Sequence, residues 1–249
     1  MLRALIKSQQ FLSRVADRIL FPRAWRVDGN RDYLESLVHK YLREGITIYD
    51  LGGGKNPFIS LDQKKALSAT VVGLDICENE LSRAPDGVYD RTIVHDIATF
   101  RGHEDADLVL CRAVLEHVRN TAGAIEAISS ILRPGGKALI FVPSRNALYA
   151  RLNKLLPEHV KKMLLFAIYP GTKRDHGFPA FYDQCVPSQL VAVSKKYGME
   201  VAEERYYFIS YYFFFCFPCY IIWRIWLVLF WIIKGNDAAE TFSVVLVKK

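Results

Sequence analysis

The chain has 249 residues, enough for one substantial core, and its net charge of +7 favours an anionic partner such as nucleic acid, an acidic substrate or a membrane surface. A mean hydropathy of +0.08 and an aromatic content of 13% favour the membrane surface. Five scattered cysteines argue against a disulfide framework and indicate a reducing compartment. Because residues 1–15 lack the continuous apolar core of a signal peptide, we expect a cytoplasmic protein.

Residues 1–28 are predicted to form a basic amphipathic helix. The apolar residues that recur at helical spacing are Leu12, Val15, Ala16 and Ile19. Arginine and lysine dominate the segment, and Asp17 is the only acid in residues 1–27. The helix could pack on the rest of the chain as a lid, or it could lie on a membrane surface held by anionic headgroups, and the two roles are compatible. We assign residues 29–249 to one domain.

An apolar strand that ends in an acid and three glycines organises the rest of the chain. A helix over Asn30–Glu44 is expected to precede a buried first strand over Ile46–Leu51, and Asp50 lies at the exit of that strand. Gly52, Gly53 and Gly54 follow directly. Glycine is needed where a chain turns sharply from strand to helix with a ligand against its backbone. We therefore predict a cofactor loop at this point.

A second acid lies about 20 residues further on, where a nucleotide-binding unit carries a carboxylate for the ribose hydroxyls. Asp75 fills this role at the end of a predicted second strand over Thr70–Ile76. The loop has Pro57 in place of the third glycine of a dinucleotide fingerprint, and no pyrophosphate clamp is evident. A nucleoside without phosphates therefore fits the pattern better.

Further helices and strands are expected to alternate along the remainder of the chain. The predicted strands are Arg91–Ile97, Asp105–Cys111, Lys137–Val142, Met199–Tyr207 and Ala239–Val247. The predicted helices are Leu61–Ala69, Ala122–Leu132 and Pro187–Tyr197, with a turn at Arg133–Gly136. This alternation indicates an α/β protein with a doubly wound, mostly parallel sheet.

Four motifs together resemble the class I S-adenosylmethionine-dependent methyltransferases. They are Asp50-x-Gly52-x-Gly54, Asp75, Asp96-Ile97 and Leu132-Arg133-Pro134-Gly135-Gly136. The nearest resemblance is to the type 11 group, which includes the ubiquinone- and menaquinone-biosynthesis enzymes. It covers residues 30–145 and the return strands near 199–207 and 240–248, and it departs at Asn56, where many members have a third glycine. The resemblance implies a Rossmann-like sheet of seven strands, the last two antiparallel.

The resemblance also implies S-adenosylmethionine as the cofactor. Asp50 and the glycines would hold its methionine part and Asp75 its ribose, while Asp96 would accept from the adenine amino group and Ile97 would stack on the ring. The candidate cofactor-binding residues are Asp50, Gly52, Gly53, Gly54, Asp75, Ile76, Asp96, Ile97 and Arg112.

Three residues are candidates for catalysis. The segment Lys173–Asp183 is interpreted as a substrate lid within an insertion over 144–186, where His176 could take a proton from a nucleophilic hydroxyl and Tyr182 could orient it. His117 belongs to Leu115–Val118, a signature of the family. A hydrogen-bonding role in the structure is the alternative for His176 and His117. Some relatives bind a divalent metal here, but without a third or fourth ligand we expect none.

An apolar stretch over Tyr206–Ile233 contains a single charge, Arg224. By length it could span a bilayer of about 30 Å. A single crossing would, however, separate the last two strands that the family pairs, and the helix expected after Pro218, over Cys219–Ile233, is only about 22 Å long. We therefore expect the insertion over 206–234 to dock on a membrane in a monotopic, in-plane or re-entrant way. The alternative is an oligomer interface or a buried cap.

These observations predict methyl transfer from S-adenosylmethionine to an amphiphilic or lipid-linked acceptor, with oxygen methylation favoured, on the cytoplasmic face of a membrane. The enzyme would be a peripheral, monotopic protein. One alternative is a soluble small-molecule methyltransferase that forms a homodimer through the apolar insertion. Another is a catalytically inactive membrane scaffold. Nucleic acid is not expected as a partner, because the basic residues line no recognisable readout module.

Overall fold

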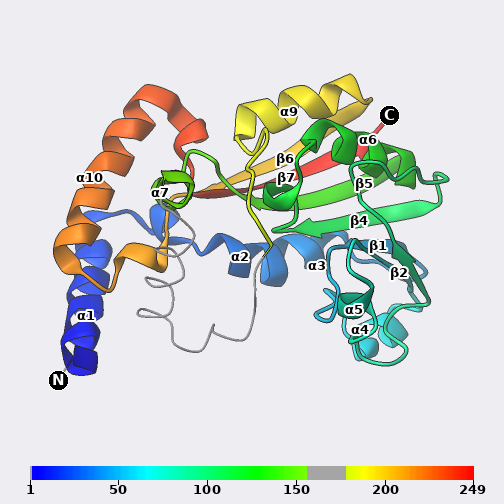
Figure 1. The fold of residues 1–249 in the computed structure, drawn as a ribbon, viewed down its shortest axis with the longest axis horizontal. Helices are drawn as coiled ribbons and strands as arrows, with labels where there is room; N and C mark the ends of the chain where they lie inside the picture. The colour runs from blue at the N-terminus through cyan, green and yellow to red at the C-terminus, as the bar shows by residue number, and fades with distance from the viewer. Residues whose placement is uncertain (1, 156–177) are drawn as a thin grey trace. The chain divides into compact units, whose positions relative to one another are not determined.

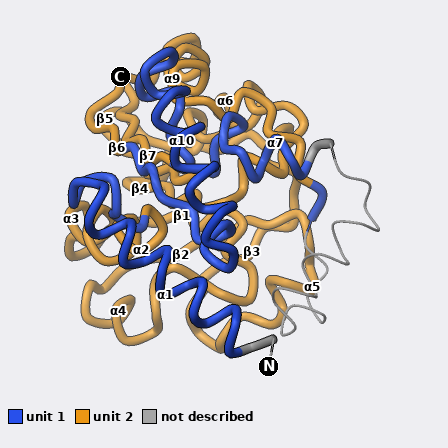
Figure 2. The backbone as a smooth tube through the Cα atoms, turned by 90° about the vertical axis from the view of Figure 1, so that its left-hand side faces the viewer, with its two compact units in different colours: residues 1–28, 143–179, 206–241 blue, residues 29–142, 180–205, 242–249 orange. Residues whose placement is uncertain are grey.

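The protein is described here from a computed structural model that places residues 2–155 and 178–249. The chain divides into two compact units, each assembled from three segments (Figure 2). Unit 1 comprises residues 1–28, 143–179 and 206–241, and unit 2 comprises residues 29–142, 180–205 and 242–249.

A seven-stranded sheet lies almost wholly in unit 2, with strand order β3-β2-β1-β4-β5-β7-β6 (Figure 1). The strands are β1 Thr47–Leu51, β2 Thr70–Asp75, β3 Arg91–Val94, β4 Ala106–Arg112, β5 Leu132–Pro143, β6 Met199–Tyr207 and β7 Thr241–Lys248. The pairs β1–β2, β1–β4, β2–β3 and β4–β5 are parallel. The amide of Glu240 donates to the carbonyl of Tyr207 at 2.9 Å, and that of Lys249 to Gly198 at 3.1 Å. Since these bonds join opposite ends of β6 and β7, the last two strands are antiparallel, and the predicted seven-stranded doubly wound sheet is confirmed.

The central strands are buried along nearly their whole length, as expected for parallel strands covered on both faces. In Figure 1, α6 (Thr121–Ile131) and α9 (Pro187–Lys196) lie on one side of the sheet, and α2 (Gly29–Asp32) and α3 (Val38–Tyr41) lie on the other. A π-helical turn, Tyr33–Leu37, joins α2 to α3. The remaining helices of unit 2 are α4 (Leu61–Ala66), α5 (Glu78–Leu81) and a 3-10 turn, Leu115–His117.

Several predicted boundaries were wrong. The third strand ends at Val94 instead of Ile97, because the side chain of Asp96 accepts from the amide of Ala98 at 2.9 Å and closes a turn there. The predicted turn Arg133–Gly136 lies inside β5 as an irregularity, since Leu132 pairs with Ala106 and Lys137 pairs with Leu108. The helix before β1 ends at Tyr41, and α4 ends at Ala66, shortly before Ser68 adopts a left-handed φ of 48°.

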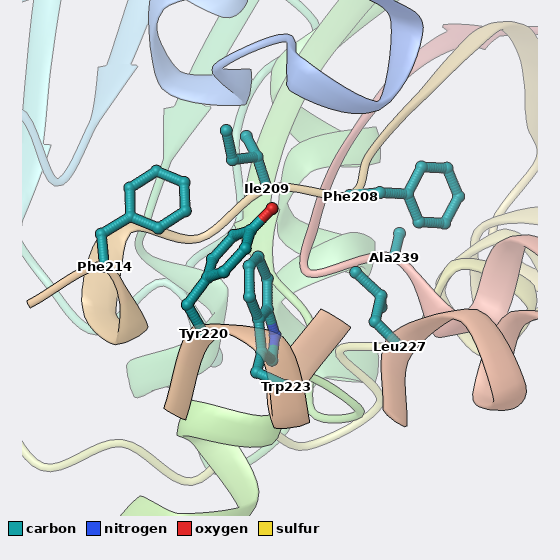
Figure 3. Close-up of a cluster of buried hydrophobic side chains, with 7 residues drawn as sticks. All are labelled: Phe208, Ile209, Phe214, Tyr220, Trp223, Leu227 and Ala239. Carbon is teal, nitrogen blue, oxygen red and sulfur yellow. The ribbon is translucent and has the colours of Figure 1, made fainter. Parts of the chain in front are cut away.

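Unit 1 is helical and has a core of its own. Its elements are α1 (Leu2–Leu20), a 3-10 turn (Arg23–Arg26), α7 (Leu148–Leu155), a 3-10 turn (Tyr211–Phe213), α10 (Phe217–Lys234) and a 3-10 turn (Gly235–Ala238). The core cluster consists of Phe208, Ile209, Phe214, Tyr220, Trp223, Leu227 and Ala239. Figure 3 shows the rings of Tyr220 and Trp223 projecting side by side from α10 toward Ile209. Aromatic packing therefore holds α10 to the segment that leads into it.

The apolar helix is longer than predicted, and the N-terminal helix buries polar side chains. α10 begins at Phe217, with Pro218 in its first turn, and its 18 residues extend about 27 Å. By length and composition alone, Phe217–Ala238 could cross a membrane, and 22% of its most apolar window is buried. In α1 the polar Ser13 and Asp17 are buried, whereas the apolar Leu12 and Ile19 are 44% and 76% exposed. The reason is that Asp17 pairs with Arg224 of α10.

Candidate cofactor and acceptor site

The three glycines after β1 form a loop that a side chain would disrupt. Gly52 and Gly54 have φ values of +68° and +49°, which glycine adopts far more readily than other residues. A Cβ atom on Gly52 would lie 2.5 Å from Cγ2 of Val114. A Cβ atom on Gly53 would overlap both carboxylate oxygens of Asp50. The loop backbone therefore packs directly against that carboxyl group, which explains the glycine requirement.

The carboxyl group of Asp50 is fully buried and incompletely satisfied. Its Oδ2 atom accepts from the amide of Phe58 at 3.0 Å and lies 3.1 Å from the Tyr89 hydroxyl. Its Oδ1 atom has no hydrogen-bond partner among the described residues. Burial raises the pKa of Asp50 to about 7, an effect that Phe58, Tyr89 and the charge of Arg112 partly offset. An orphaned buried acceptor of this kind suits a ligand that brings N–H donors and positive charge.

Asp75 lies at the end of β2, the neighbour of β1, so its carboxyl group is at the same edge of the sheet as Asp50. Its Oδ1 atom accepts from the amide of Cys77 at 2.9 Å, and its Oδ2 atom lies 3.2 Å from where a Cβ atom on Gly54 would be. Burial raises the pKa of Asp75, and the nearby carboxylate of Glu80 adds to the effect. The glycine loop thus runs beside two buried acids.

The other candidates at this edge differ in exposure. Ile76, directly after Asp75, is 60% exposed, whereas Ile97 is 7% exposed. The backbone of His95 donates to the carbonyl of Asp75 at 3.0 Å and so places Asp96 next to the end of β2. Asp96 is exposed, and one of its oxygens is occupied by the amide of Ala98. Asp50, Asp75 and Asp96 therefore follow three neighbouring strands at one edge of the sheet.

Arg112 ends β4, on the other side of β1, and its guanidinium lies 4.6 Å from the centre of the Phe58 ring. Burial lowers the pKa of Arg112, and the neighbouring Tyr33 and Asp50 offset part of that effect. The next residue, Ala113, has a left-handed φ of +54°, and its amide donates to the carbonyl of Phe141 at 2.8 Å. A strained non-glycine residue at the exit of a central strand is typical of functional sites.

The segment that contains Tyr182 is bonded to the 3-10 turn after β4 that contains His117. The amides of Phe181 and Tyr182 donate to the carbonyl of Glu116 at 2.7 and 3.0 Å. Tyr182 is buried and has a φ of +54°, and Nε2 of His117 lies 3.8 Å from Oε1 of Glu116. The structure thus brings part of the predicted lid to the exit of β4. His176 lies outside the described residues.

Two residues near these groups were not among the candidate site residues predicted from the sequence. Glu116 is buried, has an Oε2 atom without a partner among the described residues, and has a pKa raised to about 8 by burial. Tyr89 contacts both Asp50 and the carbonyl of Gly54, the latter at 3.2 Å. The only sequence signal for Tyr89 is Gly73 in the middle of a buried strand, because a Cβ atom there would lie 2.9 Å from the Tyr89 ring.

Comparison with known sequences relates the chain to methyltransferases. A family model described as a methyltransferase domain matches residues 23–201. The ubiquinone biosynthesis O-methyltransferase of Thiobacillus denitrificans is 25% identical over 166 residues, which are 64% of this chain and 66% of that protein. The corresponding enzyme of Leptothrix cholodnii is 28% identical over 182 residues, 70% of this chain and 72% of that protein. The chain thus spans slightly less than two thirds of the Thiobacillus enzyme.

Solved structures share the fold at low sequence identity. The magnesium protoporphyrin IX methyltransferase of Synechocystis, solved with bound SAH, has a TM-score of 0.55 and 16% identity, with 89% of this chain and 84% of that chain covered. A SAM-dependent methyltransferase from Methanosarcina mazei also has a TM-score of 0.55 and 16% identity, with coverages of 86% and 97%. With the family model covering more than half of its length, the chain belongs to the methyltransferase domain family, the class I methyltransferases that use S-adenosylmethionine.

Proposed function

We propose that this chain transfers a methyl group from S-adenosylmethionine to an amphiphilic or lipid-linked acceptor at the cytoplasmic face of a membrane, with an oxygen atom as the favoured target. The observation that carries the proposal is the buried carboxyl group of Asp50, which lies against the glycine loop with one oxygen unpartnered. The bound cofactor would supply an electrophilic methyl group on a positively charged sulfonium. Its charge and its amino group match the unpartnered acceptor.

The three acids at this end of the strands would each bind a different part of the cofactor. Asp50 and the loop Gly52–Gly54 would hold the methionine part, where the absence of side chains lets the backbone approach closely. Asp75, with Ile76 beside it, would accept from the ribose hydroxyls. Asp96 would face the adenine amino group through the oxygen that Ala98 leaves free, with Ile97 packed beneath the ring. Arg112 would offset the negative charge of the buried acids.

The exit of β4 is the proposed acceptor side. Oxygen methylation is favoured because the relatives compared above are named O-methyltransferases. A hydroxyl nucleophile must lose a proton, and a histidine suits that task near neutral pH. His117 is therefore proposed as the base, and Tyr182, whose amide is bonded to the carbonyl of Glu116, is proposed to orient the acceptor. His176 stays a second candidate from the sequence. The main contribution of the protein would be to align the nucleophile with the methyl group and to exclude water.

The membrane location is supported by the exposed apolar side chains of α10. Ile222, Ile232 and Ile233 are 67%, 67% and 73% exposed in the structure. A surface of this kind needs an apolar partner, and a membrane would also concentrate an amphiphilic acceptor. We also propose that the chain has two parts, an N-terminal helix over 1–28 and a domain over 29–249. The domain would contain insertions at 144–186 and 206–234.

Calorimetric titration with S-adenosylmethionine and S-adenosylhomocysteine tests the cofactor site, and transfer of a radiolabelled methyl group to a total lipid extract tests the acceptor class. We expect micromolar binding and a labelled product in the organic phase. Binding without a labelled lipid, but with labelling of water-soluble hydroxylated aromatics, would support the soluble alternative. Absence of binding in both buffer and liposomes would support the scaffold alternative.

A further inference from the structure

We infer that α1 and α10 form one docking element that lies in the plane of a membrane and selects anionic phospholipids. The inference rests on the proposed function, because it names the surface at which the acceptor would be met. The sequence prediction treated the N-terminal helix and the apolar insertion as two separate membrane-docking segments, whereas a buried ion pair joins the two helices in the structure.

The ion pair fastens the two helices together inside unit 1. The guanidinium of Arg224 is 2% exposed and pairs with the carboxylate of Asp17, which also accepts from the hydroxyl of Tyr220 at 2.9 Å. A second nitrogen of Arg224 donates to the carbonyl of Phe208 at 2.7 Å. The ring of Phe21 covers the guanidinium at 4.2 Å. The only charge in the apolar stretch is therefore neutralised by a residue of α1 and is not exposed on the surface of α10.

Exposed apolar side chains of α10 lie beside those at the end of α1. On α10 the exposed residues Ile222, Ile225, Leu229 and Ile232 follow helical spacing. Leu20, at the end of α1, is 61% exposed. It lines a groove of about 350 Å³ together with Phe21 and with residues of α10, namely Ile221, Arg224, Ile225, Val228 and Leu229. The atoms exposed in this groove are almost entirely carbon, so its chemistry fits hydrocarbon chains of a bilayer.

Positive charge accompanies the apolar surface. The exposed Lys7, Arg14 and Arg18 recur at helical spacing on α1, opposite a stripe formed by the exposed Leu5, Leu12 and Ile19. Among the residues that the structure describes, no carboxylate pairs with these three cations. A helix with one apolar face and one basic face lies in the headgroup region, where anionic lipids attract the cations. Charge complementarity therefore identifies an anionic bilayer as the partner.

The two ends of the segment that contains α10 argue for an in-plane arrangement. The amide of Glu240 donates to the carbonyl of Tyr207 at 2.9 Å, so the chain leaves and returns at the same place. If α10 crossed a bilayer, residues 208–216 would have to cross it as well. That stretch contains only a short 3-10 turn, Tyr211–Phe213, and irregular backbone is not tolerated against lipid. Docking from one side avoids this conflict.

The test is flotation of the purified full chain with vesicles of phosphatidylcholine alone and of phosphatidylcholine with phosphatidylglycerol, without cofactor or acceptor. We expect tight binding only to the second kind. The variant R14Q/R18Q should bind anionic vesicles about 25-fold more weakly, from about fivefold for each charge. The variant I232S/I233S should lose more than tenfold, because it removes exposed apolar surface and leaves the core intact.

The matched control is K195Q/K196Q, which removes two exposed cations from α9 in unit 2 and should leave vesicle binding unchanged. Equal loss in this control, equal binding to both kinds of vesicle, or concentration-dependent dimerisation without vesicle binding would each overturn the inference. Calorimetry with S-adenosylmethionine on the same samples separates this failure from that of the proposed function, since R14Q/R18Q should keep its cofactor affinity.

Discussion

In unit 2 the buried carboxyl group of Asp50 receives neutral donors and keeps one oxygen without a partner among the described residues, whereas in unit 1 the buried carboxylate of Asp17 forms an ion pair with Arg224. Both acids are hidden from water, but only the second has its charge cancelled by a direct contact within the protein. The first is available to a cationic ligand, while the second fastens two helices. Burial of an acid therefore indicates function only when its charge and its hydrogen-bonding capacity are left open.

Breaking the pair in unit 1 should have the largest effect. The substitution Arg224→Met leaves the carboxylate of Asp17 buried without its cation, and losses of about 3–5 kcal/mol are expected for such a change. Urea unfolding followed by tryptophan fluorescence measures it. All four tryptophans, Trp25, Trp223, Trp226 and Trp231, belong to unit 1, so the signal reports that unit alone.

The double substitution Asp17→Asn/Arg224→Met provides the control, because it removes both charges. It should recover most of the lost free energy of unfolding. If the double variant is as unstable as the single one, the cost comes from lost packing of Arg224 on the rings of Phe21 and Trp223 and not from an uncompensated charge.

Removing a carboxylate from the candidate site in unit 2 should instead weaken the binding of S-adenosylmethionine. The substitution Asp75→Ala removes a carboxylate proposed to accept from the cofactor, and a hydrogen bond to a charged group is worth about 1.5–3 kcal/mol. We expect S-adenosylmethionine to bind roughly 10- to 100-fold more weakly by calorimetry. Asp86→Ala, which removes an exposed acid of the same unit, should leave affinity unchanged. Wild-type affinity in Asp75→Ala would remove this residue from the proposed site.

The same contrast explains what the sequence could predict. The glycine loop, Asp50 and Asp75 are close in sequence, and their spacing follows from strand–turn–helix geometry, so this end of the first two strands could be predicted. The seven-stranded sheet was expected from the resemblance to the methyltransferases. The pairing of Asp17 with Arg224 could not, because 207 residues separate the two and neither stands in a motif. In the sequence, Asp17 was noted only as the single acid of a basic helix, and the apolar residues of that helix could have faced either the rest of the chain or a membrane. The structure exposes two of them, Leu12 and Ile19.

The contact between Tyr89 and Asp50 could not be predicted from the sequence, for a similar reason. It depends on a gap left by Gly73 in the neighbouring strand, and such a gap has no side chain to suggest its occupant. Likewise, the carbonyl of Glu116 receives two amides from residues 181 and 182, a contact that only tertiary structure can form.

The raised pKa of Asp50 predicts how stability depends on pH. Between about pH 4 and pH 7 the folded protein keeps the proton of this carboxyl group, whose pKa is about 7, whereas the unfolded chain has lost it. The free energy of unfolding should therefore fall as the pH rises through this window and become independent of Asp50 above it. Asp50→Asn should flatten the curve by roughly 1–3 kcal/mol over the same window.

Urea unfolding monitored by far-ultraviolet circular dichroism across that pH range measures the effect. Glu116→Gln sharpens the comparison, since the pKa of Glu116 is about 8 and its contribution should continue to a higher pH. A wild-type curve that rises with pH between 5 and 7, and that Asp50→Asn leaves unchanged, would contradict the assignment of a neutral buried acid at about that pH.

The smallest expected effect separates the conformational need for glycine from the steric one. Gly52 and Gly198 have nearly equal φ values of +68° and +72°, but a Cβ atom would meet Val114 at Gly52 and nothing within 4 Å at Gly198. Alanine at either position should therefore lower the free energy of unfolding by about 1 kcal/mol because of the left-handed backbone. At Gly52 the loss should be up to about 1 kcal/mol larger, because Val114 must leave its rotamer.

Only Gly52→Ala should also weaken binding of S-adenosylmethionine, and Gly52→Ala/Val114→Ala should recover the steric part of the stability loss. Equal effects of the two single substitutions on stability and on affinity would mean that the loop needs glycine for its backbone conformation alone.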